Sequence, residues 1–234
     1  MRVEGKRFFK PVYGIVSKEE AKRHVALAEE YIAYLRSIGV NVPETVFHLE
    51  QEAKGVRIVI EQPLFAESEF LSTILSSGSE EEVKKAFEQT LRMLLHSFTR
   101  ANHKLTATID INSGNFAIRG DKVYYIDVFP PLFLAKEKRV HRGHMSLPSR
   151  LKSGVLPLRI QGSPPYLVSR FVLSCSDLRP QMKKWFVRRA KQLLHEQLPP
   201  ELREKYMHYL SPFWISFWHS LRKARNYIVE KIFP

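Results

Sequence analysis

The chain has 234 residues, of which 44% are hydrophobic and 26% are charged, and its formal net charge is +13. This composition is typical of a globular protein with one large domain or two small ones, and the sequence has no run of about 18 uncharged apolar residues that would predict a transmembrane helix. The single cysteine, Cys175, excludes an internal disulfide framework and a multi-cysteine metal site, and the basic N-terminal segment lacks the apolar stretch of a secretory signal, so a cytoplasmic location is expected.

The first part of the chain is predicted to be rich in strands. Residues 6–16, "KRFFKPVYGIV", combine aromatic and β-branched residues and predict a strand. Ser17, with Glu20 three positions later, predicts a capped helix start, and Gly39 predicts the end of that helix. "NVPETVFHLE" and "GVRIVIEQPLF" then predict two strands joined by a turn at Gly55.

Helices are predicted in the rest of the chain, interrupted by one hairpin. A short helix is expected near residues 67–76 and a long one over 80–101, whose three initial glutamates suit the positive end of the helix dipole. "LTATIDINSGNFAIRGDKVYYIDVF" predicts an irregular loop and then two short strands around "RGDK". Prolines, including Pro164 and Pro165, are expected to prevent helices over 136–176. Further helices are expected near 179–197, 199–209 and 212–232.

The positive charge is concentrated after residue 135, in "AKEKRVHRGH", "RLKSG", "KKWFVRRAK" and "LRKAR". Lys183, Lys184, Arg188 and Arg189 recur at helical offsets and are expected to form one basic stripe. Such a surface fits a nucleic acid or another anionic partner. A solvated surface that binds no partner is the open alternative.

Asp110, Asn115 and Asp127 are the candidate site residues, in "TIDINSGNFAIRGDKVYYIDVFPP". Asx residues favour turns, so a purely local role is one interpretation. Asp127 fits it less well, because it follows the apolar run "VYYI" and a buried carboxylate needs a partner or a metal. The pattern D-x-x-x-x-N, a hairpin, and an apolar strand ending in Asp resembles the catalytic centre of the protein-kinase-like superfamily, and most closely its aminoglycoside and choline kinase branch.

The order of elements before this segment is similar to that branch as well. A strand carrying Lys10 comes first, followed by a helix with Glu29 and Glu30, two strands, and a long helix that ends in a Leu-His pair at His96. The resemblance covers residues 8–130. It implies a two-lobed α+β fold with a truncated, strand-rich N-terminal lobe over 1–63. Residues 64–234 would form a mostly helical C-terminal lobe with the catalytic-loop hairpin at 105–130 and a basic helical tail.

The resemblance also implies roles for single residues in an ATP- and Mg²⁺-dependent phosphotransferase. Asp110 would orient the acceptor hydroxyl and accept its proton, while Asn115 and Asp127 would bind Mg²⁺. Lys10 would contact the nucleotide phosphates. Glu29 is chosen over Glu30 as its partner, because Glu29 lies beside the apolar face of its helix.

The adenine ring would lie against the backbone of Glu61, Gln62 and Pro63. The acceptor would be a hydroxyl group of a small molecule or a macromolecule, and the sequence does not identify it.

Three features depart from the resemblance. Only nine residues precede Lys10, too few for the glycine-rich hairpin of the family, so the chain begins too late, the nucleotide is held without that hairpin, or ATP binding is lost. Thr108 and Ile109 replace the His-Gly or His-Arg pair before the catalytic Asp. "VFPP" follows Asp127, and its prolines make a mobile activation segment doubtful.

These departures leave two alternatives open. One is an inactive kinase-like module that binds nucleic acid or a protein through its basic half. The other is an unrelated basic helical binding protein.

Overall fold

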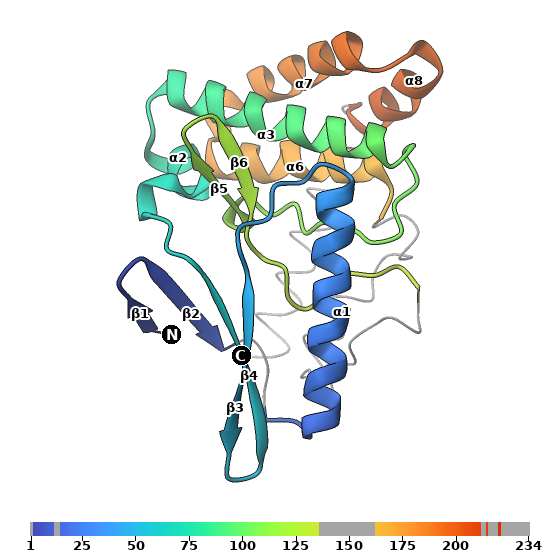
Figure 1. Cartoon of the computed structure of the whole chain (residues 1–234). Coiled ribbons are helices and arrows are strands. Elements are labelled where there is room, and N and C mark those ends of the chain that lie inside the picture. Colours follow the sequence, from blue (N-terminus) through green and yellow to red (C-terminus); the bar gives the residue numbers. More distant parts are fainter. Residues whose placement is uncertain (1, 12–14, 136–161, 212–213, 215–219, 221–234) are drawn as a thin grey trace.

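The computed structural model describes residues 2–11, 15–135, 162–211, 214 and 220, and shows a mixed α+β fold (Figure 1). Residues 2–63, called the sheet region below, form a four-stranded sheet and one long helix. The described residues of 64–211, called the helical region, form a group of helices and a two-stranded hairpin. Among the helices described, none has the length and apolar character needed to cross a membrane.

The sheet is antiparallel, with the order β1-β2-β4-β3. Its strands are β1 (Arg2–Glu4), β2 (Arg7–Pro11), β3 (Val46–Glu52) and β4 (Gly55–Pro63). The strand predicted over 6–16 is confirmed as β2 in its first part; residues 12–14 lie outside the described residues, and Val16 pairs with Val56 in an isolated bridge. Because side chains alternate between faces, Lys10 lies on one face of β2 and its neighbour Phe9 on the other.

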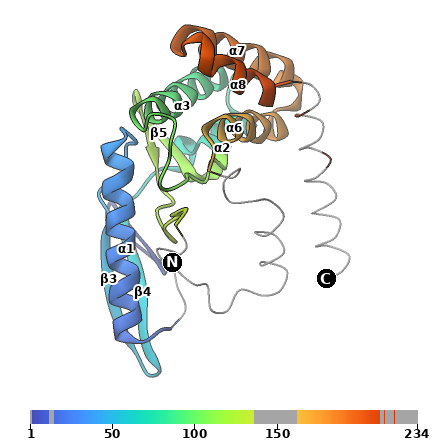
Figure 2. The same ribbon diagram turned by 90° about the vertical axis from the view of Figure 1, so that its right-hand side faces the viewer.

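Helix α1 (Lys18–Ser37) covers one face of the sheet, alongside β3 and β4 (Figure 2). Both predicted ends are confirmed. The side chain of Ser17 accepts a hydrogen bond from the N–H of Glu20 at 3.2 Å, and Gly39 follows the helix with φ +87°. The buried stripe of α1 consists of Ala21, His24, Ala28, Tyr31, Ile32 and Leu35.

The helical region starts with a 3-10 turn (Glu67–Glu69), α2 (Leu71–Ser77) and the long helix α3 (Glu80–Arg100). The predicted start of α3 is confirmed by a capping box between Ser79 and Glu82. Phe87 of α3 is fully buried and packs against rings from two other helices, with centroid distances of 5.5 Å to Phe171 and 4.8 Å to Phe186. These aromatic contacts form the centre of the helical core.

Helix α6 (Pro164–Leu178) corrects the prediction that prolines prevent a helix in this part of the chain. Pro164 and Pro165 occupy its first turn, where the backbone N–H has no partner within the helix, so proline is tolerated there. Eleven of its 15 residues are buried.

Two further helices, α7 (Lys183–Gln197) and α8 (Pro200–Tyr209), follow α6. A 3-10 turn (Pro180–Met182) precedes α7, so that helix starts later than predicted. The helix expected over 212–232 lies outside the described residues, apart from single positions.

The predicted hairpin is confirmed as β5 (Phe116–Arg119) and β6 (Lys122–Tyr125), preceded by a 3-10 turn at Ser113–Asn115. The chain before the hairpin pairs with the chain after it: the N–H of Thr108 bonds the carbonyl of Leu132 at 2.9 Å, and the N–H of Leu134 bonds the carbonyl of Thr106 at 3.0 Å. The loop and hairpin between them are thereby closed at their base.

Candidate functional site

Asp110 is presented by a loop that two buried isoleucines anchor. Ile109 and Ile111 are 1% and 5% exposed, and Asp110 between them is exposed. Burial of both neighbours holds the loop to the core and leaves the carboxylate outside it. Its Oδ1 also accepts the N–H of Asn112 at 3.2 Å, so the local turn role weighed from the sequence is present too.

Asn115 links this loop to the strand that leads to Asp127. Its Nδ2 donates to the carbonyl of Asp110 at 3.2 Å, and its own carbonyl accepts the N–H of Ile126 at 2.9 Å. The amide nitrogen is thus engaged inside the loop, and the amide oxygen is the end that can serve as a metal ligand. Asp110, Asn115 and the residue before Asp127 are therefore neighbours, although a hairpin separates them in sequence.

Asp127 is joined to the sheet region by an ion pair. Lys10 Nζ lies 3.5 Å from Asp127 Oδ1, and the two side chains are 47% and 31% exposed. The lysine comes from β2 and the carboxylate from the segment after β6, so the contact exists only because the two regions pack together.

Two buried tyrosines lie within electrostatic range of both Asp110 and Asp127. Burial raises the pKa of Tyr31 and Tyr125 above the usual tyrosine value, and the negative charges of Asp127 and Asp110 raise both further. Both carboxylates thus act on the same two hydroxyls. The sequence named the carboxylates as candidates but gave no signal for the tyrosines.

Helix α6 contacts the same loop through Ser174, which lies beside Ser113. The N–H of Ser113 and the hydroxyl of Ser174 lie 3.4 Å apart, and the two serine oxygens are also 3.4 Å apart. Ser113 and Ser174 are both buried. Sequence reasoning missed this support because it predicted no helix at α6.

Gln62 lies on the site side of the sheet. Its Nε2 donates to the carbonyl of Ile126 at 3.2 Å and to the hydroxyl of Thr45 at 3.1 Å. It therefore connects β4 to the residue preceding Asp127.

The side chain of Glu61 points to the face of the sheet opposite to Lys10, so the predicted nucleotide contact at Glu61 depends on its backbone, as expected from the sequence. Arg7 Nε lies 2.6 Å from its Oε1, and His48 Nε2 lies 2.6 Å from its Oε2. The hydrogen bond from Arg7, together with that from His48, lowers the pKa of Glu61. Adjacent strand residues face opposite sides, so only the backbone of Glu61 remains a candidate for nucleotide contact.

The expected Lys10–Glu29 pair is corrected. Glu29 is exposed, and the partner recorded for Lys10 is Asp127. The buried stripe of α1 passes through Ala28 and Tyr31, and Glu29 lies one residue, or about 100°, away from Ala28 around the helix. Glu29 lies near Ile32 in sequence, but it is at the edge of the apolar face of α1 and not on that face.

The oxygen ligands at the site suit Mg²⁺, which takes few protein ligands, better than a metal ion that needs a full set of protein side chains. Among the described residues, no group of three or more His, Cys, Asp or Glu side chains could hold a metal ion. Mg²⁺ typically binds one or two protein carboxylates and completes its shell with water and substrate phosphates. The Asp127 carboxylate and the Asn115 amide oxygen suit that arrangement.

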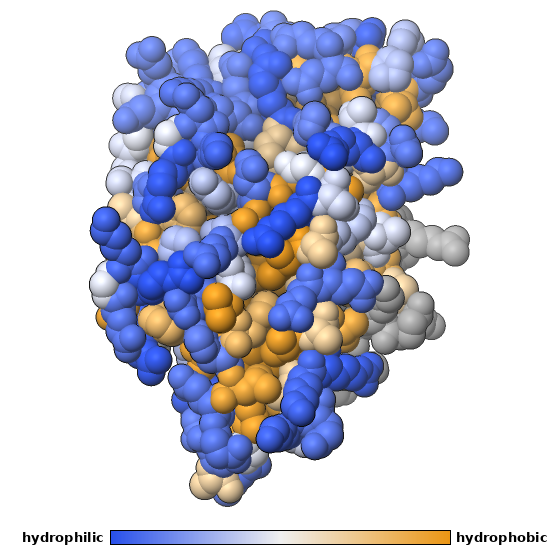
Figure 3. Space-filling model, viewed as in Figure 1, coloured by the Kyte–Doolittle hydropathy of each residue, from blue (hydrophilic) through white to orange (hydrophobic). Residues whose placement is uncertain are grey.

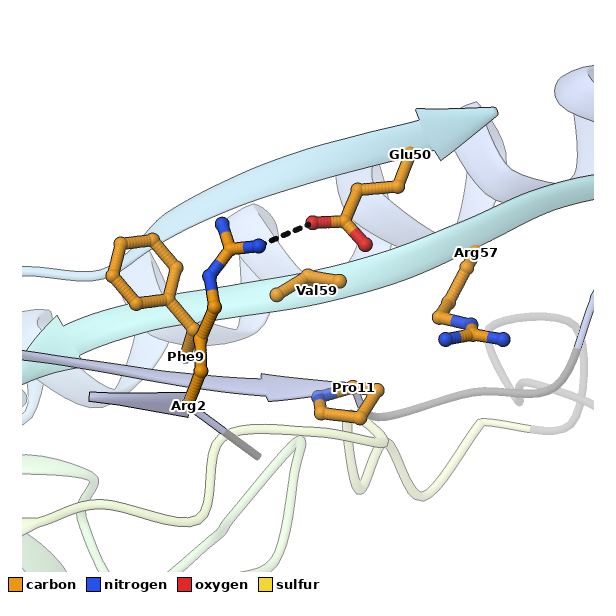
Figure 4. A pocket seen from close by; sticks show the side chains of 6 residues that line it. All are labelled: Arg2, Phe9, Pro11, Glu50, Arg57 and Val59. Atoms are coloured by element: carbon orange, nitrogen blue, oxygen red, sulfur yellow. Dashed lines mark ion pairs between the residues drawn. The ribbon is translucent and has the colours of Figure 1, made fainter. Parts of the chain in front are cut away.

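A shallow pocket lies elsewhere, on the sheet face opposite to Lys10 (Figure 4). It is lined by Arg2, Phe9, Pro11, Glu50, Arg57 and Val59. Its charged groups are already paired, since Arg2 lies 3.8 Å from Glu50 and Arg57 lies 2.9 Å from Glu52. We therefore place the candidate site at Lys10, Asp110, Asn115 and Asp127.

The predicted basic stripe on α7 is interrupted. Arg189 is held by both oxygens of Glu88 at 2.8 Å and by Glu196 at 3.0 Å, whereas Lys183, Lys184 and Arg188 are exposed. The hydrogen bonds to Glu88 raise the pKa of Arg189. Arg189 thus stabilises the packing of α7 on α3.

The chain belongs to DUF6206, a family of unknown function whose model matches residues 5–227. No curated protein and no solved structure matches it.

Proposed function

We propose that this protein is a kinase-like phosphotransferase that uses ATP and Mg²⁺ to phosphorylate a hydroxyl group of a small molecule or a macromolecule. The observation that carries this proposal is the Lys10–Asp127 ion pair of 3.5 Å beside the Asp110–Asn115 loop. Residues that serve only as turn formers have no reason to meet a lysine from a distant strand. A cation beside carboxylates is what phosphate and metal binding require.

The arrangement of elements adds support. In this proposal, the sheet region and the helical region are a reduced N-terminal lobe and a helical C-terminal lobe. Strand β2 carries Lys10, α1 packs on the sheet, and β4 leads through residues 64–66 into the helices. This is the order that the resemblance implies for residues 8–130.

Each site residue then has a defined task. Lys10 binds the nucleotide phosphates, and Asp127 and Asn115 hold Mg²⁺ through their oxygens. Asp110, exposed at the end of its anchored loop, orients the acceptor hydroxyl and accepts its proton. When bound, ATP supplies the phosphoryl group and Mg²⁺ offsets its negative charge. Phosphoryl transfer needs positioning and charge stabilisation more than covalent help from the protein.

A thermal-shift experiment with two variants tests the proposal. Because a ligand that binds the native state stabilises it, MgATP at about 100 times its Kd should raise the Tm by roughly 5–10 °C. Asp127→Asn should abolish this shift. Asp110→Asn should retain the shift but lose phosphoryl transfer from ATP to water by a factor of about 100 or more.

Asp121→Asn is the matched control. Asp121 is 87% exposed in the hairpin turn, away from Lys10, and its substitution should leave the shift unchanged. The Tm without ligand must be compared as well, since Asp127→Asn also removes the ion pair with Lys10. A folded wild-type chain with no shift in millimolar MgATP would contradict the proposal and favour the inactive module.

The exposed cations of α7 favour one second candidate, an inactive kinase-like module that binds nucleic acid. Lys183, Lys184 and Arg188 are exposed in the first two turns of that helix, whereas Arg189 is bonded to Glu88 and Glu196. Replacing all three by Glu should weaken binding to a single-stranded oligonucleotide and reduce its salt dependence, because each phosphate contact releases counterions. Unchanged binding, or none in the wild type at low salt, contradicts this candidate.

A further inference from the structure

Two buried tyrosines hold the backbone on both sides of Ile109, directly before Asp110. The hydroxyl of Tyr31 in α1 donates to the carbonyl of Thr108 at 2.8 Å. The hydroxyl of Tyr125 in β6 accepts the N–H of Asp110 at 3.2 Å. Each hydroxyl also acts on the pKa of the other, so the two lie close together, and both side chains are 0% exposed.

These two hydrogen bonds run in one direction along the loop. Tyr125 accepts from Asp110, so its own proton is available for Tyr31 beside it, and the proton of Tyr31 goes to Thr108. Each hydroxyl thus has a backbone partner in the core. The usual tyrosine pKa of about 10 keeps both hydroxyls protonated near neutral pH, so this direction is maintained.

Packing alone does not require these hydroxyls. The ring of Tyr31 lies against Phe133 with a centroid distance of 5.9 Å, and the ring of Tyr125 lies against Phe116 at 5.6 Å. Phenylalanine would fill both places without the cost of burying a polar group. What the hydroxyls add is a fixed geometry for residues 108–110.

We propose that the Tyr31–Tyr125 pair is the positioning device of Asp110. This inference rests on the proposed function, and it assigns the two tyrosines as positioning residues that act through the loop backbone. It also accounts for a departure noted in the sequence: Thr108 and Ile109 stand where the family has a His-Gly or His-Arg pair, and here hydroxyls from α1 and β6 bond the backbone of the loop. The two hydrogen bonds thereby fix the backbone position from which the Asp110 carboxylate extends. The charge of Asp127 also acts on the pKa of both tyrosines.

Tyr34 provides an internal comparison on the same helix. Its hydroxyl accepts the N–H of Thr106 at 3.2 Å, one helical turn after Tyr31 and two residues before Thr108. Its replacement by Phe removes the same atom and a similar bond, but not a bond next to Asp110. Tyr34→Phe is therefore the matched control.

The experiment measures ATP hydrolysis by the full chain in Mg²⁺, with wild type, Tyr31→Phe, Tyr125→Phe and Tyr34→Phe. We expect Tyr31→Phe and Tyr125→Phe to lower kcat by about 10- to 100-fold, because small displacements of a catalytic group have effects of this size. Their KM for MgATP should stay within about twofold, since Lys10, Asn115 and Asp127 are untouched. Tyr34→Phe should keep both constants within about twofold of wild type.

The outcomes are distinguishable. Wild-type hydrolysis with full kcat in both Phe variants overturns the positioning role and leaves the proposed function standing. A wild type without MgATP binding or hydrolysis overturns the proposed function, and the positioning role with it. Equal loss of kcat in all three variants indicates general loosening of α1 and also overturns the inference.

A measurement on the wild type covers the case in which a variant fails to fold. The N–H of Asp110 lies in an exposed loop but is bonded to a buried hydroxyl, so its hydrogen exchange should be at least about tenfold slower than that of Gly114 in the same loop. Equal exchange at the two amides would overturn the inference without any variant.

Discussion

The sheet region and the helical region bury their residues to different extents. All three residues of β1 are exposed and no residue of β2 is fully buried, whereas 11 of the 15 residues of α6 are buried. Large apolar side chains with more than a third of their surface exposed occur at four described positions of the sheet region (Val3, Ile15, Val46 and Leu49) and at two of the helical region (Leu64 and Leu178). In Figure 3, hydrophilic residues dominate the surface over α3, and apolar residues reach the surface mainly lower in the view, over the sheet region.

This difference indicates unequal local stability. Regions with few buried contacts open at lower free energy than a packed core. The loop that carries Asp110 and the segment that carries Asp127 belong to the well-packed side, and Lys10 belongs to the less buried side. In the proposed enzyme, the rigid half thus carries the loop and the metal ligands, and the more open half carries the phosphate-binding lysine.

Phe87→Ala should give the largest effect and would test the unequal burial directly. Removing a ring at the centre of the helical core should lower the free energy of unfolding by about 3–5 kcal/mol. Leu49→Ala, at a β3 position that is 39% exposed, should cost less than about 1 kcal/mol. Urea unfolding measures the free energy of unfolding of both variants. Similar losses in the two would refute the unequal burial of the two regions.

Alkaline pH should destabilise the contact between the two regions through Tyr31 and Tyr125. Burial raises the folded pKa of both tyrosines above the unfolded value of about 10. The stabilisation is therefore complete below pH 10 and is lost as pH rises above it, by about 1.4 kcal/mol per pH unit for each tyrosine that ionises only on unfolding. Urea unfolding followed from neutral to alkaline pH measures this slope.

The double variant Tyr31→Phe/Tyr125→Phe is the control for that prediction. It should lose the part of the alkaline slope that Tyr31 and Tyr125 contribute and keep the part from Tyr206 and Cys175, whose pKa values burial also raises. An unchanged slope would show that other groups cause the alkaline loss.

Substitution of Arg119, which bonds residues next to the end of β4, should lower the free energy of unfolding by a smaller amount. Its guanidinium bonds both oxygens of Glu69, at 2.6 and 2.9 Å, and donates to the carbonyl of Leu64 at 2.8 Å. It also lies 4.4 Å from the centroid of the Phe65 ring. Because the side chain is 47% exposed and screened by solvent, Arg119→Ala should cost about 1 kcal/mol, and less at high salt.

Arg119→Lys separates charge from geometry at this position. Lysine keeps the charge but cannot bond two carboxylate oxygens and a carbonyl in one plane. We expect it to recover less than half of the loss, as measured by urea unfolding at two salt concentrations. Full recovery would mean that the forked geometry is unimportant.

Glu61→Gln should have the smallest effect, on the outer face of the sheet. The hydrogen bond from Arg7, and then that from His48, lowers the pKa of Glu61 below its unfolded value. A lowered carboxyl pKa stabilises the fold above the unfolded pKa, and the stabilisation is lost as pH falls through the folded pKa. The variant should therefore melt slightly below wild type at neutral pH, and the difference should disappear in acid.

The sequence by itself determined the local elements whose signals come from adjacent residues. Ser17 and Ser79 predicted two helix starts, Gly39 predicted a helix end, and "RGDK" predicted the hairpin turn, because caps and turns depend on bonds within a few positions. Proline was misread at α6, since its effect depends on whether it starts a helix or interrupts one, and the sequence around Pro164 does not distinguish the two.

The site required tertiary structure for a different reason. Asp110, Asn115 and Asp127 were recognisable from their spacing, but the partner of Lys10 was predicted as Glu29 and is Asp127. Whether a helix residue faces the sheet depends on the rotation of α1, and a rotation of about 100° separates Glu29 from Ala28. The Tyr31–Tyr125 pair joins a helix to a distant strand, and only the packing of α1 against the loop brings these two hydroxyls together.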